Sequence, residues 1–400
     1  MSIREDATAL QGDLVQLRRA LHREPELGLE LPRTQEKVLT ALDGLGLEIG
    51  MGKSLSSVTA VLRGARPGPT VLLRGDMDAL PVIERTGLDF AAQADRMHAC
   101  GHDLHTAMLA GAAQLLSARA DQLAGNVVFM FQPGEEGYDG AGKMLAEGVL
   151  DASGTRPVAA YALHVISQQL PAGVFAARRG PFLAAADTVR VTVHGVGGHG
   201  SMPHQAGDPI PAACEMVLAL QTMVTRRIDI HDPVVITVGK LHAGTQDNII
   251  PEQAYFEATV RSYSPESHTR VRDGFLRTVR GVAAAHGLTV EIDYAELYPV
   301  TVNDDRETEF AADTVAEICG PRRWAWQDRP GSGSEDFSRV IAEIPGAMIA
   351  LGATPPGVDA GKAPMNHSPL AVFDESVLAD GAALYAELAV RRLARPAPRL

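Results

Sequence analysis

Four side chains that can bind a transition metal lie close together in one short segment of this chain. They are His98, Cys100, His102 and His105 in the segment Met97–His105, which also contains the aspartate Asp103. Imidazole, thiolate and carboxylate groups are ligands that zinc, manganese, cobalt and nickel accept. A chain that uses such a segment has to fold so that donors from distant segments reach the same place. The segment therefore makes metal chemistry the first hypothesis.

Length and composition indicate a globular protein with more than one domain. The chain has 400 residues, of which 46% are hydrophobic, and one hydrophobic core rarely organises so many. A formal net charge of −13 argues against nucleic acid as a partner, because binding phosphates needs a basic surface. No stretch approaches the ~20 apolar residues of a membrane span, so no membrane partner is expected. Three scattered cysteines do not make a disulfide framework and predict a cytoplasmic location.

The first 185 residues show the rhythm of an open α/β sheet. Short apolar runs at Val71–Arg74, Asn126–Phe131 and Val158–Leu163 are typical of buried parallel strands. Between them, Leu104–Ala118 repeats apolar residues on one helical face. This alternation predicts an open, mixed and mostly parallel sheet with helices on both faces.

Residues 186–297 follow a different pattern. Strands and helices are expected there in the order β-α-β-β-α-β, which is that of a ferredoxin-like domain. The segments are Asp187–His194, Pro211–Val224, Val234–Leu241, Gln253–Arg261, Pro265–His286 and Leu288–Tyr294. After residue 298 the α/β rhythm returns, with a strand at Ala347–Leu351. We therefore expect a catalytic domain of residues 1–185 and 298–400, with a smaller α+β domain of residues 186–297 inserted in it.

Polar residues follow four of the predicted strands at their carboxyl ends. They are Asp76 and Asp78, Glu135 and Glu136, His164 and, after a longer loop, His367. Ligands of open α/β sheets gather outside the carboxyl ends of the strands, so we expect these side chains to meet. A single histidine is more often a surface or hydrogen-bonded structural residue than a metal ligand. Because potential metal ligands follow four different strands at one edge of the sheet, a metal site is the favoured interpretation of this group.

Five separated motifs carry a resemblance to a known family. They are Arg74–Pro81, Met97–Thr106, Gln132–Gly137, Gly197–His204 and Ser332–Phe337. In this order they resemble the amidohydrolase branch of the dinuclear metallopeptidases, which includes hippurate hydrolases, N-acyl-amino-acid amidohydrolases and auxin-conjugate hydrolases. The resemblance extends over nearly the whole chain. It is specific for the family and leaves the substrate open.

The resemblance implies a cage of five residues around two divalent metal ions. Its members are Cys100, His102, Glu136, His164 and His367. A thiolate or carboxylate can bridge two cations, and a metal-bound thiol loses its proton; a small buried hydrophobic residue is the alternative for Cys100. Thiolate favours zinc whereas carboxylate and imidazole also suit manganese, so the metal stays open among Mn, Zn, Co and Ni.

The two adjacent glutamates suit two different tasks, because successive side chains of an extended segment point to opposite sides. The resemblance implies Glu135 as the general base and Glu136 as the ligand. Water bridging two cations has a pKa near neutrality, and Glu135 would take its proton and pass it to the leaving amine. A solvated acidic turn is the alternative. Residues expected to orient ligands or support them are Asp76 and Asp78, and, next to the cage, His98, Asp103 and His105.

Three further candidates lie in the predicted insert. His199 follows a strand in a Gly-rich loop, and the resemblance implies that it reaches the active site of a partner subunit and stabilises the oxyanion. Asn248 and Arg261 match positions that hold the substrate carboxylate, for which the planar fork of arginine is suited. A turn cap for Asn248 and an exposed strand-end charge for Arg261 are the alternatives. The insert is thus expected to act as a lid and to form a homodimer.

The sequence therefore predicts a metal-dependent amidohydrolase that cleaves small N-acyl amino acids or similar carboxylate conjugates. A dipeptidase or aminoacylase of the same superfamily is the alternative, and a free amine on the substrate separates the two. A non-catalytic metal-binding relative is the alternative of a different class. The presence of Glu135 as a base beside five ligands argues against it, since a binding protein needs no base.

Overall fold

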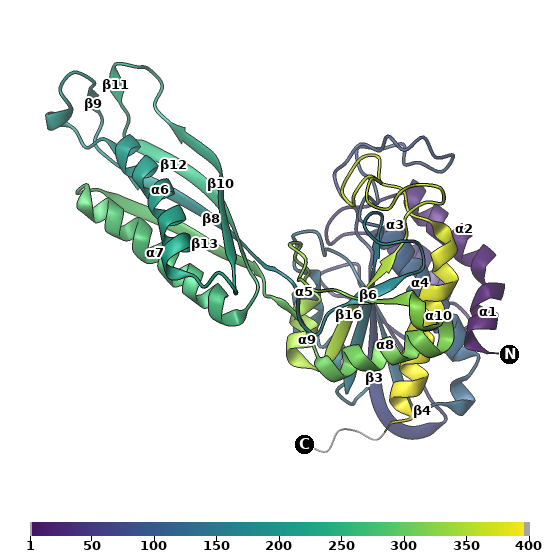
Figure 1. Cartoon of the computed structure of the whole chain (residues 1–400). Helices are drawn as coiled ribbons and strands as arrows, with labels where there is room; N and C mark the ends of the chain where they lie inside the picture. Colours follow the sequence, from purple (N-terminus) through teal and green to yellow (C-terminus); the bar gives the residue numbers. More distant parts are fainter. Residues whose placement is uncertain (1, 396–400) are drawn as a thin grey trace. The chain divides into compact units, whose positions relative to one another are not determined.

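The computed structural model describes residues 2–395, which form two compact units. The larger unit, called the catalytic unit, comprises residues up to 182, residues 302–329 and residues from 336 onwards. The smaller unit, called the insert, comprises residues 183–301 and 330–335. Both are drawn in Figure 1. Within residues 2–395, no helix has the length and apolar character needed to cross a membrane.

An eight-stranded mixed sheet forms the centre of the catalytic unit. Its strands lie in the order β1-β2-β4-β3-β5-β16-β6-β15, and the four central strands from β4 to β16 are parallel. The strands are β1 Glu48–Met51, β2 Val58–Arg63, β3 Arg66–Asp76, β4 Ala124–Gln132, β5 Ala159–Ile166, β6 Phe175–Ala177, β15 Trp324–Trp326 and β16 Gly346–Gly352. Every residue of β16 is buried, as expected for a strand covered on both faces. The predicted α/β fold with a mostly parallel sheet is confirmed.

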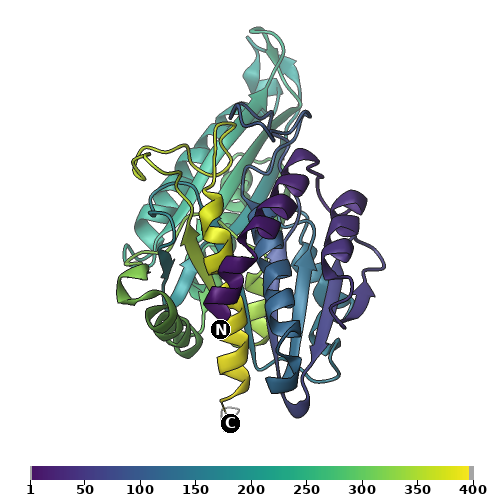
Figure 2. The same ribbon diagram turned by 90° about the vertical axis from the view of Figure 1, so that its right-hand side faces the viewer.

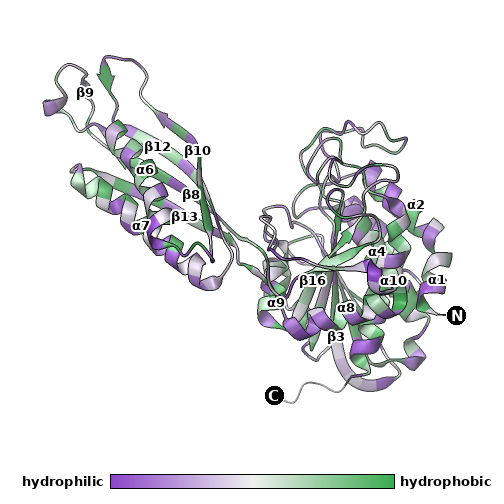
Figure 3. Cartoon of the chain, viewed as in Figure 1, coloured by the Kyte–Doolittle hydropathy of each residue, from purple (hydrophilic) through white to green (hydrophobic). Residues whose placement is uncertain are grey.

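Helices cover both faces of this sheet. On one face α4 and α10 pack on β3 and against each other, and α5 and α9 lie on the other face (Figure 1). Figure 2 shows the N-terminal helices beside α10, and Figure 3 shows hydrophobic β16 next to helices with hydrophilic outer residues. The helices are α1 Ile3–Ala9, α2 Gln11–Arg23, α3 Pro32–Leu42, α4 His102–Ser117, α5 Gly140–Ala146, α8 Asp305–Cys319, α9 Ser338–Glu343 and α10 Leu378–Leu393.

The chain changes direction across the sheet at β3. Strand β4 lies on one side of β3 and β5 on the other, and ligands of open α/β sheets bind outside such a switch point. Asp76 ends β3, and Gln132 ends β4. The sequence predicted that β5 ends before His164, but apolar Val165 and Ile166 extend the strand. His164 therefore lies inside β5, where it pairs with Ala350 of β16.

The insert is a four-stranded antiparallel sheet with two helices. The strand order is β10-β12-β8-β13, and the elements follow one another in the order β-α-β-β-α-β. They are β8 Ala185–His194, α6 Pro209–Arg227, β10 Val234–Ala243, β12 Gln253–Ser262, α7 Pro265–Ala285 and β13 Thr289–Tyr298. Two small sheets consist of β9 Gly198–His199 with β11 Ile249–Ile250, and β7 Gly180–Leu183 with β14 Thr301–Asn303.

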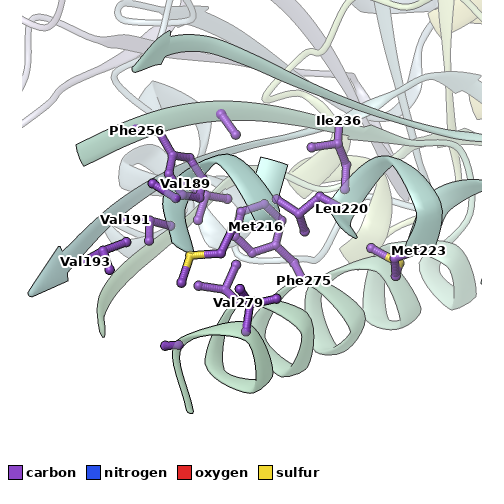
Figure 4. Close-up of a cluster of buried hydrophobic side chains, with 14 of the residues drawn as sticks. Val189, Val191, Val193, Met216, Leu220, Met223, Ile236, Phe256, Phe275 and Val279 are labelled. Carbon is purple, nitrogen blue, oxygen red and sulfur yellow. The ribbon is translucent and has the colours of Figure 1, made fainter. Parts of the chain in front are cut away.

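The insert has a hydrophobic core of its own. Val189, Val191 and Val193 alternate along β8 and are fully buried, because every second side chain of a strand faces the same side. They pack with Met216 of α6 and Phe275 of α7 (Figure 4). A separate core lets the insert hold its shape without residues of the catalytic unit.

Candidate metal centre

The catalytic unit brings the five predicted metal ligands together at the carboxyl edge of its sheet. Their donor atoms form two sets, and within each set all atoms lie within 4.8 Å of one another. The first set is Cys100, His102 and His164, and the second is Cys100, Glu136 and His367. Two donor sets that share one thiolate have the arrangement of a two-metal site with a bridging ligand.

Cys100 is the residue common to both sets. Its Sγ lies 3.4 Å from Nε2 of His164 and 3.3 Å from Nε2 of His367. The next residue, Gly101, has a φ of 85°, and a Cβ there would lie 2.3 Å from Cγ2 of Val165, so only glycine allows this turn into α4. Burial would raise the pKa of the Cys100 thiol, but the charges of His164 and His102 hold that pKa well below its usual range.

His102 is the first residue of α4 and is fully buried. Neither of its ring nitrogens makes a hydrogen bond within the described part of the chain. Nδ1 lies 3.4 Å from Oδ1 of Asp78, and Nε2 lies 3.6 Å from Oδ2 of Asp76. Burial would lower the pKa of His102, but Asp76 and Cys100 raise it well above its usual value. Because buried polar atoms are almost always satisfied, this ring fits a bound cation.

Glu136 and His367 supply the other side of the centre. Nε2 of His367 lies 3.2 Å from Oε1 of Glu136. Contacts of the ring with Cys100 and Glu136 raise the pKa of His367 to about 10. Burial and the nearby Cys100 raise the pKa of Glu136. The negative charges of Cys100 and Glu136 stabilise a positive charge on the neighbouring imidazole. The same negative charges would stabilise a bound divalent cation.

Asp76 and His105 support the centre without joining either donor set. Nδ1 of His105 donates to Oδ1 of Asp76 at 2.6 Å, and Nε2 accepts from the Val165 amide at 2.8 Å. Burial lowers the pKa of His105 to about 4, so the ring is neutral. Asp76 was expected to orient a ligand histidine. Its Oδ1 accepts from His105, which bonds to β5 next to His164, and its Oδ2 accepts from Arg74 and lies 3.6 Å from Nε2 of the predicted ligand His102. Burial would raise the pKa of Asp76, but Arg74 helps to hold it well below its usual range.

Asp78 holds the segment that carries both glutamates. Its Oδ1 accepts from the amide of Glu135 at 3.0 Å, and its Oδ2 accepts from the amide of Glu136 at 3.1 Å. Glu135 is buried and shares a third group of close donor atoms with His102 and Glu136. Glu135 therefore lies beside the centre but outside the two sets that share Cys100, as a general base would.

Asn366 contributes contacts for which the sequence pattern predicts no role. Its Nδ2 donates to the carbonyl of Cys100 at 3.2 Å and to that of Val165 at 3.0 Å, and its Oδ1 accepts from the amide of Ser167 at 2.9 Å. One amide side chain thus joins the Cys100 turn, the end of β5 and the loop of His367. Its position next to His367 is the only signal in the sequence.

A second buried polar cluster ties α2 to the first turn of α4. Oδ2 of Asp103 lies 2.8 Å from Nε of Arg18 and accepts from Nδ1 of His22 at 2.7 Å. These contacts are compatible with the expected role of Asp103, which is to support the neighbouring metal ligands. His98 has no hydrogen bond from either ring nitrogen among residues 2–395, and burial lowers its pKa to about 3. The structure therefore gives no support to the part expected of His98.

The three predicted site residues of the insert lie at two different places within it. His199 in β9 pairs with Ile249 in β11, and the amide of Gly200 donates to the carbonyl of Asn248 at 2.8 Å. Arg261 lies near the opposite end of β12, eight residues beyond Gln253, which is about 26 Å along a strand. Its guanidinium donates to Oγ1 of Thr259 at 2.7 Å, and burial lowers its pKa.

Comparison with known proteins gives the family. The pattern of peptidase family M20/M25/M40 matches residues 72–391. The chain belongs to this family. Thermostable carboxypeptidase 1 of Saccharolobus solfataricus is 38% identical to it over 394 residues, which are 97% of this chain and 98% of the relative. N-acetylcysteine deacetylase of Bacillus subtilis is 35% identical over 379 residues, 94% of this chain and 96% of the relative.

A solved structure agrees with this assignment. A dinuclear metal-binding peptidase of the M20 family from Bacillus subtilis is 32% identical, superposes with a TM-score of 0.82, and covers 96% of this chain and 99% of its own. The family resemblance of the five motifs and the predicted enzyme class are confirmed. This member of the M20/M25/M40 family is a metal-dependent hydrolase of amide bonds.

Proposed function

We propose that this enzyme hydrolyses the amide bond between an acyl group and a small amino acid or similar carboxylate. The observation that carries the proposal is the pair of donor sets that share Cys100, with the buried Glu135 beside them. A base next to a two-metal donor set is what hydrolysis by activated water requires. A protein that only stores metal needs no such base.

We assign Cys100, His102, Glu136, His164 and His367 to two divalent cations. When bound, such cations lower the pKa of water and polarise a carbonyl group. The thiolate and three imidazoles favour zinc, and the carboxylate also suits manganese. We propose zinc or manganese as the resident metal, with cobalt and nickel as substitutes.

Glu135 is the proposed general base. Its carboxylate would take a proton from the attacking water and return it to the nitrogen of the leaving amine. Asp78 contributes by holding the Glu135 and Glu136 amides at 3.0 and 3.1 Å. One carboxylate thus places the base and a ligand relative to each other.

The leaving group is proposed to carry a carboxylate. Two relatives of this chain are named as a carboxypeptidase and an N-acetylcysteine deacetylase. Both names describe cleavage of an amide whose nitrogen side carries a carboxylate. Arg261 is half-buried and its planar guanidinium suits a carboxylate. We propose that Arg261 of one subunit and Asn248 of the partner subunit, where Asn248 lies beside His199, bind this group.

The insert is proposed to act as lid and dimerisation domain, with His199 reaching the site of a partner subunit. His199 and Arg261 lie at opposite ends of the insert sheet, so one small substrate cannot touch both residues of the same chain. A two-fold dimer can supply His199 from one subunit and Arg261 from the other. The edge strand β10 carries the exposed apolar residues Val235 and Leu241, which supports pairing between copies.

A hydrolysis screen tests the proposed function. The chelated enzyme is reloaded with Zn, Mn, Co or Ni and given N-acetyl, N-benzoyl and indole-acyl amino acids, the matching amides without a carboxylate, and dipeptides with a free amine. We expect cleavage of the acyl amino acids and little cleavage of the amides that lack a carboxylate. Cleavage of the free-amine dipeptides alone would favour the dipeptidase alternative. Light scattering that shows only monomers in active enzyme would contradict the part given to His199.

A further inference from the structure

The segment that carries Glu135 and Glu136 is a closed loop between β4 and α5. The amide of Gly140 donates to the carbonyl of Gly134 at 3.0 Å. A Cβ at Gly140 would lie 1.7 Å from the carbonyl oxygen of Pro133, so the chain returns almost onto its starting point. The two ends of this loop, called the glutamate loop (residues 133–139), are therefore neighbours.

A single carboxylate, that of Asp336, holds both ends of the glutamate loop. At the start of the loop, Nε2 of Gln132 lies 2.8 Å from each oxygen of Asp336. At the end of the loop, the amide of Ala141 donates to Oδ2 of Asp336 at 2.9 Å. Asp336 is fully buried, so solvent does not compete for its acceptor oxygens. Asp78 holds the middle of the same loop through two amides.

Arg74 joins Asp336 to the supporting groups of the metal centre. Its Nη2 donates to Asp336 at 3.1 Å, its Nη1 to Oδ2 of Asp76 at 2.7 Å, and its Nε to Oε1 of Gln132 at 2.9 Å. The side chains of Arg74, Asp76 and Asp336 are all fully buried. Buried charges are costly unless they are paired and hydrogen-bonded, and here the planar guanidinium reaches three partners at once.

Asp336 also lies close to the proposed base. One of its carboxylate oxygens is within 4.8 Å of an oxygen of Glu135. It is at the same time the first residue of the catalytic unit after the chain returns from the insert. Three residues later in this segment, Arg339 of α9 pairs with Asp139 at the end of the glutamate loop. Contacts from one short segment thus fix the loop at three points.

We propose that Asp336 is a positioning residue, which acts through Gln132 and Ala141 to place Glu135 and Glu136 for catalysis and metal binding. The proposal rests on the proposed function of these two glutamates. Asp336 itself touches neither substrate nor metal in this assignment. Groups that orient metal ligands and catalytic residues commonly change affinity or activity by about 10–100-fold.

The test compares Asp336→Asn with a matched control. Asparagine keeps the size of the side chain but has no charge and one acceptor oxygen in place of two. It loses the ion pair with Arg74, and its NH2 group faces either Arg74 or the Ala141 amide. The control is Glu307→Gln, which breaks another buried carboxylate–guanidinium pair, to Arg392 at 3.0 Å. Glu307 lies on α8, and within residues 2–395 its carboxylate bonds to Arg392 and Tyr161 and to no residue of 132–141. Gln132→Met removes the hydrogen bonds between Asp336 and the start of the glutamate loop but leaves the ion pair of Asp336 with Arg74 in place. It is the second test variant if Asp336→Asn does not fold.

Three readouts separate positioning from general stability. In Asp336→Asn we expect the Ala141 amide to exchange with deuterium at least about tenfold faster, because it loses a charged acceptor. Metal affinity, measured by competition with a chelator, should fall about tenfold, and kcat of the fully loaded enzyme about 100-fold, with KM changed less than about threefold. Gln132→Met should follow in the same direction, whereas Glu307→Gln should lower only the melting temperature.

The proposal is overturned if Asp336→Asn lowers the melting temperature as Glu307→Gln does while loop exchange, metal affinity and kcat stay at the wild-type level. Unchanged values in Gln132→Met would overturn it in the same way if Asp336→Asn does not fold. Exchange and metal affinity are measured without substrate. They therefore decide the placement of the loop even if no acyl amino acid is cleaved, a result that would instead contradict the proposed function.

Discussion

The Sγ atom of Cys100 lies 3.3 Å from Nε2 of His367, although 267 residues separate the two in the chain. Two other hydrogen bonds also join their loops. The backbone amide of His367 donates to the carbonyl of Ala99 at 2.8 Å, and the side-chain Nδ2 of Asn366 donates to the carbonyl of Cys100 at 3.2 Å. The approach of the loops thus does not depend on the thiol alone. Loss of the thiol should remove a metal donor and leave the fold intact.

Replacement of Cys100 by serine should lower metal occupancy. A serine hydroxyl keeps its proton far more firmly than a thiol, so the shared anionic donor is lost. After dialysis against limiting metal, elemental analysis should give one metal or fewer per chain instead of two. The matched control is Cys214→Ser, an exposed cysteine on α6, which should keep both. Two metals per chain in Cys100→Ser would reject the bridging assignment.

Replacement of Glu135 by glutamine should separate chemistry from metal binding. The amide has nearly the same shape but cannot take a proton from water, so kcat should fall by about 100–10,000-fold. Metal content should stay unchanged, because Glu135 belongs to neither set that shares Cys100. Glu136→Gln is the contrasting variant, and it should lose metal as well. Near-normal turnover in Glu135→Gln would remove that residue from the mechanism.

Replacement of Asp78 by asparagine should weaken the enzyme without unfolding it. Asparagine offers one acceptor oxygen, so the amide of Glu135 or that of Glu136 loses its partner. We expect kcat/KM to fall by about 10–100-fold in the presence of excess metal. Asp208→Asn is a suitable control, because Asp208 caps α6 of the insert and asparagine caps equally well. Equal activity of the two variants would contradict the role given to Asp78.

Metal binding should strengthen as the pH rises. The pKa of His367 is raised to about 10 by Cys100 and Glu136, and that of His102 is also raised, so both rings hold protons at neutral pH and must release them to bind metal. The pKa of Cys100 is held low, so the thiol adds no proton. Affinity measured by chelator competition should therefore rise about tenfold or more per pH unit between roughly pH 6 and 9. His367→Ala should show a shallower slope, and a flat profile in the wild type would contradict this view.

The sequence predicted the features that repeat or that lie at strand ends. Apolar runs with a helix between them indicated the parallel strands, and the order β-α-β-β-α-β described the elements of the insert. The predicted end of β5 was wrong because the polar His164 interrupts an apolar run in the sequence. In the structure, pairing with β16 continues through His164 to Ile166.

The buried charge networks could not be predicted in this way. Arg74 and Asp336 are 262 residues apart, and Arg18 and Asp103 are 85 apart, and hydrophobic patterns assign such residues to the surface. They are buried because each finds an opposite charge from another element. Only the folded chain shows which pairs meet, and this is why Asn366 and Asp336 were missed as parts of the site.

A mixed dimer gives the sharpest test of the part proposed for His199. One chain carries Glu135→Gln and the other His199→Ala, and the two are co-expressed with different affinity tags and purified over both. If His199 serves the partner's site, the His199→Ala chain has an intact base and receives His199 from the Glu135→Gln chain. One site of each pair is then complete, so about half of the wild-type activity should return. If His199 served its own chain, both sites would be damaged and the mixed dimer would be as inactive as either parent.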